Sequence, residues 1–151
     1  MAGKRKLLAI ASGGGHWIQL LRLRPAFDEY EMVFVSMLES YAEQIAPSRF
    51  HVVPDASRFD IKGFAPVFFK ALRIILKERP AAIVTTGSAP MLAFIVLGRL
   101  FGIRTLWIDS IANSERMSSS GRMARKLAHR CISQWPEVAR AEGVEHWGSV
   151  I

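Results

Sequence analysis

The fold of this chain is decided by residues 7–21, which read LLAIA-SGGGH-WIQLL. The first five residues are an apolar run typical of a buried strand, the glycines favour a tight turn, and the apolar residues after His16 favour a helix. Nucleotide-binding α/β folds open a phosphate or diphosphate site with this order of elements. Glycine lets the backbone approach an anion, and N–H groups at the helix start point toward it. The predicted anion site comprises Ser12, Gly13, Gly14 and Gly15.

His16 is expected at the mouth of this site. An unperturbed imidazole has a pKa of about 6.5, so it can act as a base or bind an anion. The glycine spacing matches neither the G-x-G-x-x-G pattern of dinucleotide sites nor the G-K-[ST] end of a P-loop. Two interpretations stay open: a functional anion loop, and a tight structural turn whose histidine bonds to a neighbouring loop.

The rest of the chain alternates between strand-like and helix-like segments, which predicts a parallel sheet. Strands are expected at residues 7–11, 32–36, 50–53, 82–86, 105–108 and 131–135, with a last strand-like piece at 146–151. Helices are expected at residues 17–29, where Pro25 can divide the helix, and at 40–45, 65–78, 91–101, 122–129 and 137–142. A chain of 151 residues has room for one domain with its own core. We therefore expect a single Rossmann-like α/β domain over residues 1–151, with helices on both faces of the sheet.

A second loop follows the β-branched strand predicted at residues 82–86. It contains Thr86, Gly87 and Ser88 and leads into a helix, so it can offer N–H groups and a hydroxyl to an anion, with Ser88 as the N-cap. An ordinary capped helix start explains the same residues. Ligands bind at the carboxyl ends of the strands in open parallel sheets, so this loop is expected to face the glycine loop across one crevice.

A third loop starts at Asp109, at the end of the strand predicted at residues 105–108. A carboxylate at this edge suits general-base work or binding of a sugar hydroxyl, and Glu115 is a rival base. Arg116 and Arg122 are candidates to hold phosphate, and Asn113 to bind substrate. The alternatives are an aspartate that caps a turn and a solvated, serine-rich mobile segment.

The composition points to an anionic partner. The net charge is +7 and the isoelectric point about 10.2, while half of the residues are hydrophobic and the mean hydropathy is +0.19. No apolar run reaches the roughly 18–20 residues that span a bilayer, and the basic start of the chain is taken as part of a first strand rather than a signal peptide. The basic residues are scattered rather than interleaved with exposed aromatics, so no nucleic-acid partner is expected.

Few residues suggest redox or metal chemistry. Cys131 stands alone, which excludes an internal disulfide and fits a reducing cytoplasm. His51 and His129 have no metal-like company, and we predict no metal site and no tightly bound cofactor.

The helix predicted at residues 65–78 is both basic and unusually apolar. A helix of this kind can lie on an anionic membrane, with apolar groups in the interface and basic groups on lipid phosphates. The residues expected there are Phe68, Phe69, Lys70, Leu72, Arg73 and Lys77. The alternative is a core helix with a basic solvent face.

Four motifs resemble a known family. They are SGGGH at residues 12–16, VTTGSAP at 84–90, WIDSIANSERMSSSGRMARKLAHRCISQWPE at 107–137, and HWGSVI at 146–151. They are similar to the acceptor-side subunit of two-subunit glycosyltransferases. That family includes the membrane-recruiting subunit of the eukaryotic dolichol-linked N-acetylglucosaminyltransferase (asparagine-linked-glycosylation protein fourteen) and bacterial PssD-type exopolysaccharide proteins. The family's glutamate in the third loop is Asp109 here, and its arginine position is Asn113.

The resemblance implies the N-terminal, acceptor-binding half of a GT-B glycosyltransferase. A separate subunit, equivalent to the C-terminal half, would bind the UDP-sugar donor at the subunit interface. The acceptor would be a polyprenyl-diphosphate-linked sugar, and the subunit would work peripherally at the cytoplasmic face of the inner membrane. Transfer would invert the configuration at the anomeric carbon of the donor sugar. The chain would be inactive without its partner. A non-catalytic scaffold that recruits the partner, and a free-standing nucleotide-binding domain, are the competing functions.

Overall fold

One parallel sheet organises the chain in the computed structural model, which describes residues 3–55 and 61–150. Six strands of this described part form the sheet, in the order β3-β2-β1-β4-β5-β6. They are β1 (Lys6–Ile10), β2 (Glu31–Ser36), β3 (Phe50–Val52), β4 (Ala82–Thr85), β5 (Arg104–Ile108) and β6 (Arg130–Ile132). The order reverses between β1 and β4, which pair with each other. This switch point places the loops after β1 and β4 where open α/β sheets bind ligands.

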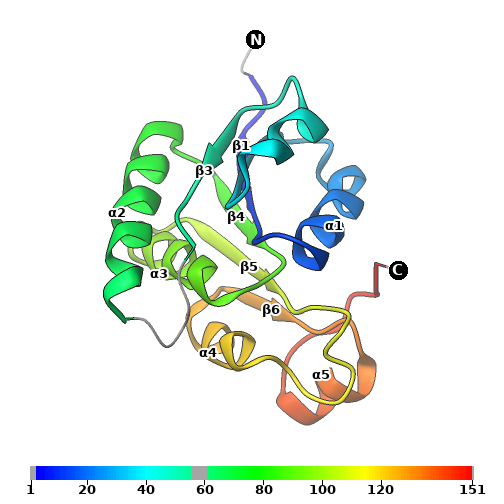
Figure 1. Cartoon of the computed structure of the whole chain (residues 1–151). Helices are drawn as coiled ribbons and strands as arrows, with labels where there is room; N and C mark the ends of the chain where they lie inside the picture. The colour runs from blue at the N-terminus through cyan, green and yellow to red at the C-terminus, as the bar shows by residue number, and fades with distance from the viewer. Residues whose placement is uncertain (1–2, 56–60, 151) are drawn as a thin grey trace.

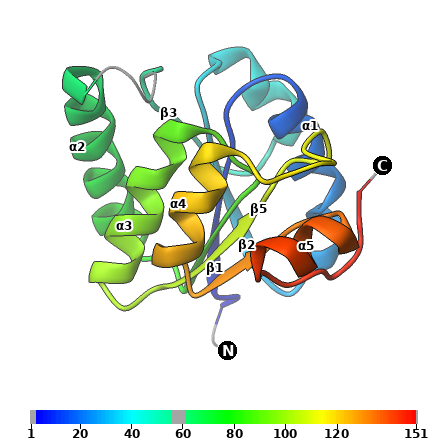
Figure 2. The ribbon, with the colours of Figure 1, turned by 90° about the horizontal axis from the view of Figure 1, so that it is seen from below.

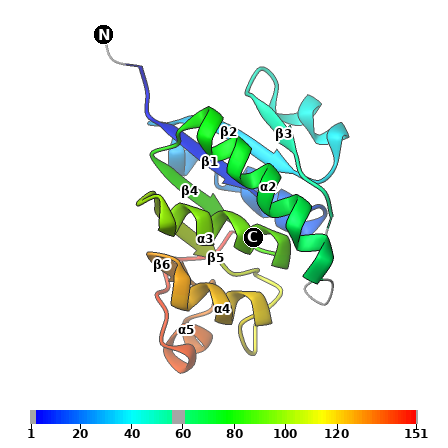
Figure 3. The same ribbon diagram turned by 90° about the vertical axis from the view of Figure 1, so that its left-hand side faces the viewer.

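Helices cover both faces of the sheet (Figures 1 and 2). On one face α2 (Ile61–Glu78), α3 (Leu92–Leu100) and α4 (Ser119–Leu127) lie side by side, as the view onto this face shows (Figure 3). On the other face lie α1 (Gly15–Arg22) and α5 (Pro136–Glu142) (Figure 2). The architecture is the expected Rossmann-like one.

Alternation along β1 divides the core into two layers. Leu8 and Ile10 pack in the layer under α2 and α3, while Leu7 and Ala9 pack in the layer that contains Trp17 of α1. These four side chains are all buried, because successive residues of a strand point to opposite faces and both faces are covered. The central strand therefore holds the glycine loop on a rigid base.

Most elements lie where the sequence predicts them, but their ends differ. The first helix ends at Arg22, and a 3-10 turn, η1 (Arg24–Phe27), follows it, so Pro25 does divide the predicted helix. The segments predicted at 40–45 and before α3 include 3-10 turns, η2 (Glu39–Ile45) and η3 (Ala89–Met91). Helix α4 begins three residues earlier than predicted because Ser118 caps it, its Oγ accepting a hydrogen bond from the N–H of Gly121.

The strand-like pieces at the end of the chain are shorter than predicted. β6 ends at Ile132, and of the piece expected at 146–151 the residues up to 150 form no strand, while residue 151 lies outside the described part. Just before this piece, Glu145 forms a parallel bridge with Ile132 of β6. Gly148, at φ +119°, interrupts extended backbone there.

Candidate functional site

The glycine loop leads into α1 without a capping side chain. Gly14 adopts φ +66°, which favours glycine, and its N–H donates to the Tyr41 hydroxyl at 3.0 Å. The first N–H groups of a helix have no partner within the helix. The start of α1 at Gly15 therefore offers donors of the kind that bind phosphate.

His16 joins the first loop to the second. Its Nδ1 lies 2.9 Å from the carbonyl oxygen of Thr86, and the Thr86 hydroxyl donates in return to the carbonyl oxygen of His16 at 2.6 Å. A carbonyl oxygen only accepts, so Nδ1 of the neutral ring carries the proton and Nε2 keeps its lone pair. The pair of hydrogen bonds orients the imidazole with a basic nitrogen available.

The second loop packs directly against this ring. Gly87 has φ +119°, and a Cβ placed there would come within 3.2 Å of His16 Nδ1 and Cε1. Ser88 does not act as the N-cap that the sequence predicts. Its φ of +92° lies far from the extended backbone that capping residues adopt. The Ser88 Oγ is buried, with no hydrogen-bond partner in the described part of the chain.

Asp109 organises the third loop. Its side chain is 2% exposed and accepts hydrogen bonds at both carboxylate oxygens. The donors are Trp107 Nε1 (3.1 Å), Asn113 Nδ2 (3.1 Å), Ser118 N (3.0 Å) and Ser118 Oγ (2.7 Å). Burial of a carboxylate is costly unless it is hydrogen-bonded, and these donors satisfy it. The structure thus brings Asp109 and Asn113 together within one loop.

The remaining polar candidates are dispersed. Glu115 and Arg116 are exposed on the third loop. Arg122 is ion-paired with Glu142 of α5, with Nη2 2.9 Å from Oε1. The Arg122 guanidinium is therefore held between α4 and α5. Ser12 is buried at the start of the glycine loop.

Of the predicted membrane residues, most lie on one exposed side of α2. Phe69 is 69% exposed and Phe68 36%, and the basic residues Lys70, Arg73 and Lys77 are exposed. Leu72 is partly buried against the core. In the part of the chain that the structure describes, no helix is long and apolar enough to cross a bilayer.

Sequence reasoning missed a buried amide network beneath the loops. Gln19 of α1 and Gln134 are 5% and 3% exposed, and the Gln134 Nε2 donates to the Gln19 Oε1 at 2.7 Å. Gln19 also donates to Ser110 Oγ at 3.1 Å. The available signal was a glutamine within an otherwise apolar helix face, because a buried amide needs partners of its own.

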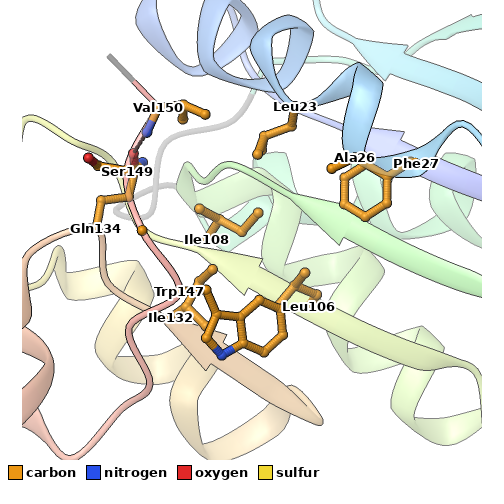
Figure 4. A pocket seen from close by; sticks show the side chains of 11 residues that line it. Leu23, Ala26, Phe27, Leu106, Ile108, Ile132, Gln134, Trp147, Ser149 and Val150 are labelled. Carbon is orange, nitrogen blue, oxygen red and sulfur yellow. Dashed lines mark hydrogen bonds between the residues drawn. The ribbon is translucent and has the colours of Figure 1, made fainter.

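A separate hollow lies on the sheet face over β5 and β6 (Figure 4). It measures about 420 Å³ and is mostly apolar, with Leu106, Ile108 and Ile132 on its floor and Trp147 on its wall. None of the predicted catalytic or substrate-binding residues lines it. Within residues 3–55 and 61–150, no three histidine, cysteine or acidic side chains are grouped as a metal would need.

Comparison with known sequences bears on the family. No protein-family model matches the chain. The UDP-N-acetylglucosamine transferase subunit ALG14 of Yarrowia lipolytica is 24% identical over 171 residues, covering 89% of this chain and 75% of that protein. The subunit of the same name from Cryptococcus neoformans var. neoformans serotype D (strain B-3501A) is 33% identical over 61 residues, 40% of this chain and 27% of that protein. The resemblance to ALG14-type subunits is confirmed.

Solved structures share the fold of this chain. MurG of Acinetobacter baumannii superposes with a TM-score of 0.72 at 12% identity, over 89% of this chain and 43% of that one. The UDP-N-acetylglucosamine 2-epimerase of Rickettsia bellii gives 0.70 at 16% identity, over 95% and 43%. These likenesses concern the fold, which is the expected N-terminal half of a GT-B glycosyltransferase. This chain thus spans less than half of the solved proteins it matches.

Proposed function

We propose that this chain is the acceptor-binding subunit of an inverting glycosyltransferase. A partner subunit, equivalent to the second GT-B half, would hold the UDP-sugar. The acceptor would be a sugar linked to polyprenyl diphosphate, used in polysaccharide or oligosaccharide synthesis. The ALG14 name, a subunit of a UDP-N-acetylglucosamine transferase, supports the donor class. The fold, which matches part of MurG, supports assigning this domain to one half of a GT-B enzyme.

One observation carries the chemistry: the contact of Nδ1 with the Thr86 carbonyl oxygen fixes His16 at the switch point, and Nε2 is the ring nitrogen without that contact. In a direct displacement the acceptor hydroxyl attacks the anomeric carbon, the new C–O bond forms, and the bond to UDP breaks. Nε2 would take the hydroxyl proton, and the electron pair of the broken bond would leave with UDP. The Thr86 carbonyl oxygen, 2.9 Å from Nδ1, would stabilise the imidazolium that forms.

We assign the base to His16 rather than to Asp109. Both oxygens of Asp109 already accept hydrogen bonds from Trp107, Asn113 and Ser118, and the carboxylate is buried. Taking a proton would cost it these donors. Asp109 would instead shape the loop that holds the acceptor, and Glu115, which is exposed, stays the second candidate for the base.

The acceptor's diphosphate would bind between the two helix starts. The glycine loop and the start of α1 would supply N–H groups, and the loop after the neighbouring strand β4 would face them. Gly87 lets the second loop pack against His16, because a Cβ at this position would press against the imidazole ring at 3.2 Å. Arg116 would offset phosphate charge from the third loop, and Asn113 would contact the acceptor sugar.

The transfer assay requires the full chain with its partner subunit and a polyprenyl-diphosphate-linked acceptor. Because a general base contributes about 10²–10⁴-fold, His16→Ala should lower kcat by at least about a hundredfold. His129→Ala, which removes a histidine that bonds Thr105 far from the loops, is the matched control and should retain activity. Full activity in both His16→Ala and Glu115→Ala, with partner binding intact, would refute a catalytic role and support the scaffold function.

We further propose that α2 attaches the subunit to the cytoplasmic face of the inner membrane. Phe69 and Leu76 are more than half exposed, and Lys70, Arg73 and Lys77 lie along the same side of the helix. Among the described residues, none of these three cations lies within 4.0 Å of a carboxylate, so lipid phosphates are free to pair with them.

Vesicle flotation tests the attachment. Each basic residue near an anionic surface contributes about 1 kcal/mol, so Lys70→Glu, Arg73→Glu and Lys77→Glu together should weaken binding to phosphatidylglycerol vesicles roughly a hundredfold or more. The control reverses the exposed Arg99, Lys126 and Arg140 for the same change in net charge. Equal loss in both triple variants would show a net-charge effect and contradict a docking face on α2.

A further inference from the structure

The C-terminal segment is tied to the candidate site through a single side chain. The N–H of Val150 donates to Gln134 Oε1 at 2.8 Å, and Gln134 Nε2 donates to the carbonyl oxygen of Asp109 at 3.0 Å. The same Nε2 reaches Gln19 of α1. One buried amide therefore touches the C-terminal segment, the start of the third loop and the helix that follows the glycine loop. Figure 4 shows Gln134 and Val150 at one end of the hollow.

The orientation of both amides follows from the chemistry of their partners. The N–H of Val150 only donates and the carbonyl oxygen of Asp109 only accepts, so the Gln134 oxygen must face Val150. Gln19 Oε1 in turn accepts from the N–H of Ile111 at 3.1 Å as well as from Gln134. Each of these groups has a partner, and Gln134 uses both its carbonyl oxygen and its NH2 group.

The segment before Val150 is held along the edge of the sheet. The Glu145 N–H donates to the carbonyl oxygen of Cys131, and the Ser133 N–H donates to that of Glu145. His146 Nδ1 lies 3.0 Å from the carbonyl oxygen of Ser133. Residues 145–150 thus follow β6 and end at the amide network.

We propose that Gln134 is a positioning residue that sets α1 and the third loop against the C-terminal segment. Gln19 lies three residues after His16 in α1, so fixing Gln19 fixes the rotation of the helix that carries the base. Gln134 also fixes the carbonyl group of Asp109, from which the third loop departs. Through Gln134, residues 145–150 therefore set the positions of α1, which carries His16, and of the third loop. The expected effect on catalysis rests on the proposed function.

Hydrogen exchange in the full chain tests the coupling without any assay of activity. Val150→Pro removes the N–H that binds Gln134, while Val150→Ala keeps it and is the matched control. Losing one hydrogen bond of about 1 kcal/mol should raise the exchange rate of the Ile111 amide about fivefold in Val150→Pro and not in Val150→Ala. Equal rates at Ile111 in the two variants would overturn the proposal.

Variants of the glutamines separate positioning from mere support of the fold. Gln134→Met keeps the length but loses both donors and the acceptor, and in the complex with the partner it should lower kcat about tenfold or more while leaving KM for the UDP-sugar unchanged. Gln19→Met combined with Gln134→Met should lower kcat by less than the product of the two single effects, because the two residues share one hydrogen bond. An unchanged kcat, or exchange that rises equally at all amides, would reduce Gln134 to a structural role.

The two proposals fail in different ways. If the wild-type complex transfers no sugar to the lipid acceptor, the proposed function is wrong, and the Ile111 exchange still decides whether Gln134 couples the segments. If transfer depends on His16 but not on Gln134 or on the N–H of Val150, the function stands and the positioning role is excluded.

Discussion

Asp109 shows how a residue type can be predicted while its surroundings are not. The sequence indicates an acidic side chain at the end of a strand, at the edge where ligands bind. It does not indicate that Trp107, Asn113 and Ser118 all turn toward that carboxylate, because those contacts depend on a loop that folds back over nine residues. Hydrogen bonds of this kind are decided by tertiary placement rather than by local propensity.

Gly121 makes the arrangement around Asp109 possible. A Cβ at this position would lie 2.5 Å from Asp109 Oδ1, and the carboxylate is held by four hydrogen bonds and cannot retreat. Gly121→Ala should therefore destabilise the protein by about 1–3 kcal/mol, the usual cost of overpacking. The measurement is the free energy of unfolding in urea.

Gly15→Ala is the control for Gly121→Ala. The same methyl group there meets nothing within 4 Å, in the first turn of α1 and without a positive φ. It should be neutral or stabilising by up to about 1 kcal/mol, because alanine favours a helix over glycine. Equal stabilities of the two variants would mean that the third loop moves freely around Asp109.

At the scale of elements, one buried carboxylate joins α2, β1 and β3. Glu78, the last residue of α2, has a fully buried side chain. It lies 2.7 Å from His51 of β3, 3.2 Å from Arg49 and 3.3 Å from Lys6 of β1. Burial alone would raise the pKa of Glu78. The hydrogen bonds of His51 and Lys6, with the charges of Arg49 and Lys6, outweigh burial and lower this pKa below its usual 4.5.

A lowered pKa implies stability that is lost in acid. The ionised Glu78 stabilises the fold fully above the unfolded-state pKa, and this contribution disappears as pH falls through the lower folded-state pKa. Glu78→Gln should cost about 2–4 kcal/mol near neutral pH, because Lys6 and Arg49 lose their charged partner and His51 loses a carboxylate hydrogen-bond partner. The difference from wild type should shrink as the pH falls from about 5 to about 3.

Unfolding by urea at several pH values gives this difference directly. Glu43→Gln is the control, since Glu43 is exposed and the chemical change is the same. A gap between wild type and Glu78→Gln that stays constant from neutral pH to about pH 3 would show that the carboxylate of Glu78 contributes no charge to the folded state.

Periodicity predicts the elements better than their ends. Every strand of the sheet overlaps a predicted apolar or β-branched run, and α1 to α5 each overlap a predicted helix. The ends depend on particular contacts, such as Ser118 capping α4 and Pro25 dividing the first helix. The prediction of a last strand was wrong. Residues 146–150 have a strand-like sequence, but the chain pairs with the sheet there only near Glu145. Backbone pairing depends on available neighbours, which a local pattern does not contain.

For the whole molecule, the order of the strands places the site. The convergence of three loops was predictable from parallel strands, but not that β1 and β4 would be neighbours, which is what lets His16 bond Thr86. The same order leaves part of one face of the sheet uncovered, and the hollow beside Trp147 lies there. Strand order is set by long-range packing of both core layers, so no motif in the sequence encodes it alone.

Cys131 reports whether these layers unfold as one unit. The thiol lies in β6 and is 7% exposed, and burial together with the nearby Asp109 charge raises its pKa to about 12. The reactive thiolate is therefore scarce while the protein is folded. Labelling by a disulfide reagent near pH 8 should be slow in the native protein and fast in urea.

Val33→Ala makes this a test of cooperativity. Val33 is buried in β2, on the far side of the sheet from β6, and its truncation should cost roughly 2 kcal/mol. If Cys131 becomes reactive only through global unfolding, its labelling rate should rise about thirtyfold in Val33→Ala, following the shift in the unfolding equilibrium. A rate that stays at the wild-type value would show that β6 opens locally. The sheet edge that carries the third loop and residues 145–150 would then move independently of the glycine loop.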